Sequence, residues 1–220
     1  MTMLSSPSSV TRAPHPMRRC IARPTWNSEA GRNLVLLLDG ALGMPDGHYN
    51  VLFLSNRNSA RSIFAEAVLN RMGHGHFAGF SAGLRPARQL DELAVDVLRV
   101  AEYPTKDLHP KHWKEFAKAD APPLDFVFTL CDLEAGEPVP RWPGRPVTGD
   151  WRYSDPVQLE DPTERRAALA ATLGGLERQL LAFMQLPFGS LDEISLRERL
   201  KELGQGFSAR APSSGVTRQS

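Results

Sequence analysis

The stretch Tyr49–Ser62 constrains the fold more than any other part of the sequence. It opens with an apolar, β-prone run, Val51–Leu54, continues through a polar loop, 55–58, and begins a helix at Ser59. A buried strand that leads through a tight loop into a helix suits anion binding, because the first N–H groups of a helix lack partners and carry partial positive charge. Arg61 in the first turn can add a planar fork of donors. The alternative, an ordinary corner with a solvated Arg61, stays open from these residues alone.

Composition and charge exclude several classes of protein. The 220 residues are 41% hydrophobic and 23% charged, which is ordinary for a globular protein. A net charge of +1 gives no electrostatic case for nucleic acid or a membrane as a partner, and the longest apolar run, Leu34–Leu38, is too short to span a bilayer. With Cys20 and Cys131 as its cysteines, the chain has no disulfide framework and no cysteine-rich zinc site. This usage suits a reducing cytoplasm, so we expect a cytoplasmic protein.

The sequence predicts no cofactor and no metal site. It has no Gly-x4-Gly-Lys-Ser/Thr motif and no Gly-x-Gly-x-x-Gly after a strand, so nucleotide binding has no support. The histidine pairs His74/His76 and His109/His112 lack nearby carboxylate or cysteine partners. Solvated loop histidines are therefore the favoured interpretation.

Three regions are expected along the chain. Residues 1–32 are rich in Ser, Pro and Arg, and five basic residues minus one acid give them a charge of +4. We interpret 1–48 as a disordered extension, with an organellar transit peptide or a true start at Met44 as alternatives. Residues 49–205 are expected to form the globular domain, and 206–220 a loose tail.

From Tyr49 onward, strand and helix patterns alternate, which predicts a parallel α/β sheet. Strands are expected at 51–54, 77–82, 125–130 and 146–151, and helices at 59–72, 90–100, 169–183 and 191–203. Apolar residues recur at helical spacing in the long third helix, at Leu169, Leu173, Leu176, Leu180 and Phe183. Gly73 is a stop signal for the first helix.

Several motifs occur in the order in which a known family carries them. The loop reads Ser55-Asn-Arg-Asn-Ser-Ala-Arg61-Ser62, where the family has Cys-x5-Arg-Ser. Ser-Ala-Gly at 81–83, FVFTLCD at 126–132, Trp-Pro-Gly at 142–144 and Asp155-Pro156 match further family motifs. Over 49–205 the chain resembles the arsenate reductase branch of the low-molecular-weight protein tyrosine phosphatase superfamily. The resemblance implies a flavodoxin-like three-layer α/β fold with a four-stranded parallel sheet, and a site at the carboxyl end of the first strand.

The resemblance also implies a role for each residue of the loop. Arg61 would bind the oxyanion, Asp155 would protonate the leaving oxygen, and Ser55 stands in the position of the nucleophilic cysteine. The oxyanion-binding residues would be Asn56, Arg57, Asn58, Ser59, Ala60, Arg61 and Ser62. The implied ligand is arsenate or phosphate, with a phosphoprotein as a further candidate partner and the oligomeric state left open.

Two departures from the family pattern decide the expected chemistry. A thiol supplies the electrons for arsenate reduction by becoming a disulfide, which Ser55 cannot do. Val139 replaces the family's resolving cysteine. Cys131 is the remaining candidate redox residue, although a buried cysteine at a strand end is the favoured interpretation. We therefore expect thiol-based catalysis to be lost.

Three functions remain open. In the first, the loop binds arsenate or phosphate without thiol chemistry. In the second, Ser55 with Asp155 as acid supports weak phosphatase activity, for which a hydroxyl nucleophile needs a general base. In the third, the fold is a non-catalytic interaction module. Whether the chain is an enzyme therefore depends on Ser55.

Overall fold

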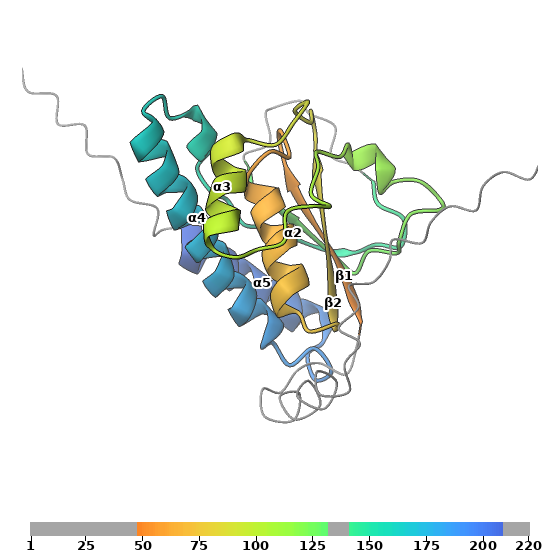
Figure 1. Ribbon diagram of the computed structural model, residues 1–220. Helices are drawn as coiled ribbons and strands as arrows, with labels where there is room; N and C mark the ends of the chain where they lie inside the picture. Colours follow the sequence, from red (N-terminus) through yellow and green to blue (C-terminus); the bar gives the residue numbers. More distant parts are fainter. Residues whose placement is uncertain (1–47, 132–140, 209–220) are drawn as a thin grey trace, which may run out of the picture.

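The computed structural model describes residues 48–131 and 141–208. In chain order the elements are β1 (Tyr49–Ser55), α2 (Arg61–Met72), β2 (Phe77–Gly83), α3 (Glu92–Val100), the 3-10 helix η1 (Trp113–Glu115), β3 (Phe126–Thr129), β4 (Val147–Asp150), the 3-10 helix η2 (Pro156–Gln158), α4 (Pro162–Met184) and α5 (Glu193–Ser208) (Figure 1). Residues 1–47, with Cys20, lie outside the described residues, as do Val139 and 209–220.

The four strands form one parallel sheet in the order β2-β1-β3-β4. This confirms the predicted four-stranded α/β fold. The chain goes from β1 to β2 at one edge and later adds β3 and β4 on the other side of β1. The connections therefore diverge at the carboxyl ends of β1 and β3, where ligands bind in open α/β sheets. The loop after Ser55 begins at this point.

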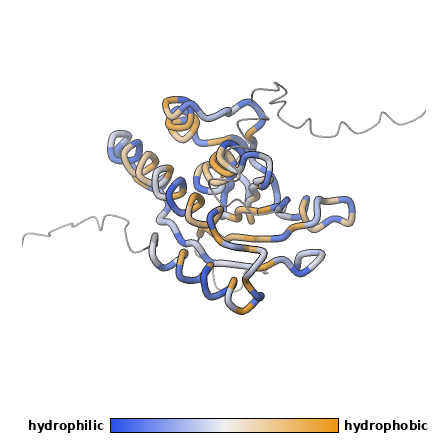
Figure 2. The backbone as a smooth tube through the Cα atoms, turned by 90° about the horizontal axis from the view of Figure 1, so that it is seen from below, coloured by the Kyte–Doolittle hydropathy of each residue, from blue (hydrophilic) through white to orange (hydrophobic). Residues whose placement is uncertain are grey.

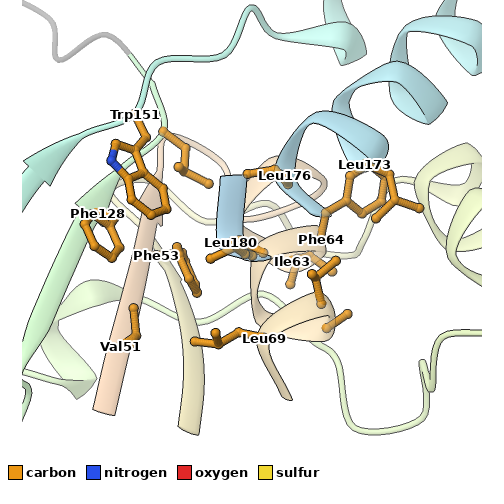
Figure 3. Close-up of a cluster of buried hydrophobic side chains, with 14 of the residues drawn as sticks. Val51, Phe53, Ile63, Phe64, Leu69, Phe128, Trp151, Leu173, Leu176 and Leu180 are labelled. Carbon is orange, nitrogen blue, oxygen red and sulfur yellow. The ribbon is translucent and has the colours of Figure 1, made fainter. Parts of the chain in front are cut away.

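The two faces of the sheet are covered differently. The larger hydrophobic core joins one face to α2, α3, α4 and α5, with Phe53, Phe128 and Trp151 fully buried in it (Figure 3). The other face carries Leu52 and Leu54, and the described residues that pack there come largely from η1 and neighbouring loops. Figure 1 shows the four α-helices on one side of the sheet and η1 on the other. Figure 2 shows hydrophobic residues gathered in the interior and hydrophilic residues on the outer turns.

The boundaries agree with the sequence patterns to within two residues except at two helix ends: α4 begins at Pro162, seven residues before the expected start at Leu169, and α5 extends beyond its expected end. The first helix was expected from Ser59 but begins at Arg61, and the last extends to Ser208, three residues beyond the expected domain end. Gly204 and Gly206 in α5 are weak helix formers. Gly204 packs so closely on β4 that a Cβ there would lie 2.5 Å from the carbonyl oxygen of Asp150. The packing of α5 on the sheet therefore outweighs the low helix propensity of its two glycines. Among the described helices, none is long and apolar enough to cross a membrane.

Candidate anion-binding site

The loop between β1 and α2 turns tightly around the end of β1. Its shape depends on Asn58, whose φ of 48° lies in the left-handed region that asparagine tolerates better than most residues. The turn ends at Ala60, and α2 begins at Arg61 without a side-chain cap. Buried loop residues are Ser55, Asn58, Ser59, Ala60, Arg61 and Ser62. The loop is therefore part of the protein interior, with its shape set by internal contacts.

The segment between β2 and α3 holds this loop in place through backbone hydrogen bonds. Four hydrogen bonds join them: Leu84 N–H to the Ser55 carbonyl, Arg85 N–H to Asn56, Ala87 N–H to Arg57, and Asp91 N–H to Ser59. The close approach requires a small residue at Gly83, because a Cβ there would lie 3.0 Å from both the Asn56 carbonyl oxygen and the Asn58 Cβ. The loop carbonyls are thus turned outward onto a neighbouring segment.

The side chain of Asn58 holds the inner side of the loop. Its Nδ2 donates to the Ser62 Oγ (2.9 Å) and to the Ser81 Oγ (2.8 Å), and its Oδ1 accepts from the Lys111 backbone N–H (2.7 Å). Its backbone N–H donates to the Ser55 Oγ (3.1 Å). The fully buried amide therefore uses both N–H groups and its oxygen, as a buried polar group should.

A buried ion pair extends this network away from the loop. The Ser81 Oγ donates to the Glu66 Oε2, and the Lys111 Nζ lies 3.0 Å from the same oxygen. The side chains of Lys111 and Glu66 are 10% and 12% exposed. The sequence patterns did not predict this pair. The available signal was a carboxylate among the apolar residues of a predicted helix, because a buried charge needs a partner.

Arg61 joins the loop to the segment after β4. Its Nη1 donates to the Tyr153 carbonyl oxygen (2.8 Å) and lies 3.4 Å from the Leu130 carbonyl oxygen, and its Nη2 lies 2.9 Å from the Asp155 Oδ2. The side chains of Arg61 and Asp155 are 7% and 17% exposed. The Asp155 Oδ1 also accepts from the Val157 N–H at the start of η2. The structure thus brings together the two charged residues named from the family resemblance.

Ser55 lies at the floor of the loop. Its Oγ is 2.7 Å from the Ser62 Oγ and accepts from the Asn58 N–H, and the residue is 2% exposed. Neither partner is a base. In the part of the chain that the structure describes, no histidine, lysine or carboxylate hydrogen-bonds to this hydroxyl, so the contacts supply no general base for a serine nucleophile.

The remaining predicted residues have different environments. The Asn56 Oδ1 is buried and accepts no hydrogen bond from the described residues, whereas Arg57 is exposed. Cys131 is a buried thiol outside any disulfide, directly after Leu130 at the end of β3. Val139, which stands at the position of the family's resolving cysteine, lies outside the described residues. Residues 48–131 and 141–208 contain no cluster of side chains that could hold a metal ion.

Comparison with known proteins gives a consistent set of relatives. Residues 50–186 match the model of a family described as low molecular weight phosphotyrosine protein phosphatase. A glutaredoxin arsenate reductase of Synechocystis is 27% identical over 57% of this chain and 87% of its own length. A solved arsenate reductase in the phosphate binding state is 26% identical over 62% of this chain and 98% of its own, with a TM-score of 0.48. An arsenate reductase from Archaeoglobus fulgidus is 27% identical over 60% and 98%, with a TM-score of 0.47.

Proposed function

The chain belongs to the low molecular weight phosphotyrosine protein phosphatase family, and from this premise we propose that its Ser55–Ser62 loop binds phosphate or arsenate without forming a covalent bond to it. The family match includes the loop, Arg61 and Asp155, so the proposal concerns the position at which relatives carry their chemistry. Within the loop, the departure that matters is at position 55, where a hydroxyl oxygen stands in place of the family's sulfur.

The observation that carries this proposal is the combination of a braced loop with unused donors. Among the described residues, no group accepts a hydrogen bond from the backbone N–H of Arg57, Ser59 or Ala60. These groups precede the N-terminus of α2, which lacks a side-chain cap and carries partial positive charge. Because the Asn58 network already sets the shape of the loop, little conformational entropy would be lost in ordering these N–H donors when an anion binds.

The guanidinium of Arg61 has donors left for a ligand. Its Nη1 has two hydrogens and two carbonyl acceptors, Tyr153 and Leu130, and its Nη2 is paired once, with Asp155. A guanidinium has five N–H donors in all. The second Nη2 hydrogen and the Nε hydrogen have no partner among the described residues, so Arg61 can bind an oxyanion while it keeps its protein contacts.

Catalysis through Ser55 is not supported by the contacts of its hydroxyl. A hydroxyl is far less acidic than a thiol, so the positive end of α2 does not ionise it as it would a cysteine. Arsenate reduction also needs two electrons from a thiol that becomes a disulfide, and serine cannot supply them. Noncovalent oxyanion binding is therefore the function that the residues present support best.

Calorimetric titration of the full chain with phosphate and with arsenate tests the proposal. We expect a dissociation constant between micromolar and low millimolar, which corresponds to about −8 to −4 kcal/mol. Arg61→Ala should abolish the heat of binding. Arg197→Ala removes the same charge from an exposed site on α5 and should leave the affinity unchanged. Equal affinities in all three proteins, or no binding by the unmodified chain, would contradict the proposal.

A further inference from the structure

Helix α5 lies outside the family match, which ends at residue 186, yet it is joined to the anion-binding site by a continuous path of contacts. We propose that α5 is a positioning element of that site, acting through Gln179 and Tyr153 on the guanidinium of Arg61. This inference rests on the proposed function, because it assigns α5 a part in anion binding.

The path begins where α5 docks on α4. Gln179 of α4 is completely buried, and its Nε2 donates to the Leu203 carbonyl oxygen of α5 (3.2 Å). Its Oε1 accepts from the Tyr153 hydroxyl (2.8 Å). One buried amide therefore joins α5 to the segment between β4 and η2. A fully buried amide that has these two partners holds both of them in place, since losing either would leave a polar group unsatisfied.

Tyr153 carries the path from Gln179 to the site. Its ring packs so closely against α4 that a Cβ at Gly175 would lie 3.1 Å from the Cε1 of the ring and 3.3 Å from the hydroxyl. Burial raises the pKa of this phenol above its usual value, so the hydroxyl remains a donor. The carbonyl oxygen of the same residue accepts from the Arg61 Nη1 (2.8 Å). Tyr153 is therefore held in place by its ring, and its carbonyl oxygen is the acceptor that orients Arg61.

A second contact holds the start of the same segment. Trp151, which directly follows β4, is fully buried and stacks on Phe128 at 3.8 Å between ring centroids (Figure 3). Its Nε1 donates to the Leu200 carbonyl oxygen of α5 (3.2 Å). Gly204 of α5 lies against the backbone of Asp150. Helix α5 therefore contacts the segment from Asp150 onward directly, in addition to the path through Gln179.

The first test removes one hydrogen bond of this path, the bond between Tyr153 and Gln179. Tyr153→Phe keeps the ring and the backbone and removes the bond to Gln179. We expect the phosphate dissociation constant to rise by roughly 3- to 30-fold, the usual size of such coupling. Phe188→Ala is the matched control, because it removes apolar packing against Tyr49 and Phe77, at the starts of β1 and β2, without touching α5 or these hydrogen bonds. It should lower the melting temperature and leave the affinity, measured well below that temperature, unchanged.

A double variant separates positioning from stability. Tyr153→Phe with Gln179→Leu replaces both members of the Tyr153–Gln179 hydrogen bond by apolar groups, so the stability that either single variant loses through an unpaired partner in that bond should be recovered, although the bond to the Leu203 carbonyl stays lost. If Gln179 and Tyr153 position Arg61, the affinity stays reduced although the melting temperature recovers. Recovery of the affinity together with the melting temperature would overturn the proposal.

A measurement without ligand separates this inference from the proposed function. In the nitrogen-15 NMR spectrum, the guanidinium of Arg61 should give a resolved, slowly exchanging signal, assigned by its loss in Arg61→Lys. In the double variant this signal should move into the bulk arginine signal. If it does so in a protein that binds no phosphate, the proposed function fails and the positioning role stands. An unchanged signal would overturn the positioning role, whether or not phosphate binds.

Discussion

The two sides of the Ser55–Ser62 loop are built in different ways. On the inner side, Asn58 contacts Ser62, Ser81 and the Lys111 backbone, and the Glu66–Lys111 pair closes the network. Many contacts share the task of holding the loop. On the outer side, Arg61 pairs with Asp155 and donates to the Tyr153 carbonyl oxygen. Reactivity there depends on a single atom, the Oγ of Ser55.

This difference shows why shape and chemistry can be separated in one site. The loop is held by several hydrogen bonds that support one another, and the Ser55 hydroxyl takes part in two of them. Nucleophilic and redox chemistry have no such redundancy, because they require an ionised and oxidisable sulfur. Under the proposed function, the loop would bind an anion without the reaction that the family resemblance implies.

The largest effect is expected from Ser55→Cys. The Asn58 N–H and the Ser62 hydroxyl, together with the N-terminus of α2, are placed to stabilise a thiolate at position 55. Hydrolysis of an aryl phosphate should rise well above that of the unmodified chain, toward the roughly 10⁶-fold in kcat that an enzyme loses when its nucleophile is removed. Steady-state assays measure this, with Ser55→Ala and Ser55→Cys/Arg61→Ala as inactive controls. An inactive Ser55→Cys protein would show that the outer side lacks more than the sulfur.

The next largest effect concerns the inner side. Lys111→Met leaves the Glu66 carboxylate buried without its partner, which should cost about 3–5 kcal/mol of unfolding free energy. Arg197→Met breaks an exposed pair on α5 and should change stability by less than about 0.5 kcal/mol. Urea denaturation of the two variants measures the difference. Equal losses would mean that Glu66 finds solvent or another partner.

The double variant Glu66→Gln/Lys111→Met sharpens this result. A neutral amide in place of the carboxylate can still accept from the Ser81 hydroxyl, so part of the lost stability should return. If the double variant is no more stable than Lys111→Met, the cost comes from the lysine side chain's packing and not from an unpaired charge.

Much of the fold was predictable because it follows local patterns. Alternating strand and helix signals predicted the parallel sheet, and the apolar run followed by polar residues predicted that a loop follows the first strand. The start of α2 was expected at Ser59, but the loop continues to Ala60. The cause is the positive φ of Asn58, which delays the start of the helix. That conformation is stabilised by partners far away in the sequence, Ser81 and Lys111.

The inner network itself could not be derived from spacing. Glu66 lies in a helix, Ser81 in a strand and Lys111 in the segment between α3 and η1, and only the sheet topology brings them together. Polar contacts between distant residues have no periodic signature, whereas apolar burial has one. The hydrogen bond between Tyr153 and Gln179 could not be derived from spacing either, because it depends on how α4 packs against the segment after β4.

A smaller effect is expected from Gly83→Ala. The added Cβ would lie 3.0 Å from the Asn56 carbonyl oxygen and from the Asn58 Cβ, so the loop must shift. Overpacking of this kind costs about 1–3 kcal/mol, and phosphate binding should weaken with it because the N–H donors move. Gly189→Ala is the control, since nothing lies within 4 Å of its Cβ position. Thermal melts and phosphate titrations of both variants check this; unchanged affinity in Gly83→Ala would show that the loop adapts.

The smallest effect concerns the N-terminal end of α5. The Asp192 Oδ1 accepts from the N–H groups of Ile194 and Ser195, and its Oδ2 accepts from the Ser195 hydroxyl. The hydrogen bonds from Ser195 hold the pKa of the exposed Asp192 carboxyl below its usual 3.8. A carboxyl whose pKa is lower in the folded state stabilises it at pH values above the unfolded pKa, and this contribution is lost as the pH falls through the folded pKa.

Melting temperatures of the unmodified chain and Asp192→Ala should therefore differ by a small, constant amount between pH 5 and pH 7, and the difference should shrink below about pH 4. Asp192→Asn retains an acceptor that does not titrate, so its difference from Asp192→Ala should not depend on pH. A pH-independent difference for the unmodified chain would show that the cap does not depend on charge. Because this cap lies far from the Gln179 contact in the path to Arg61, phosphate affinity should not change in either variant. A change would mean that the whole of α5, and not the contacts of Leu200 and Leu203 alone, sets the position of the outer side.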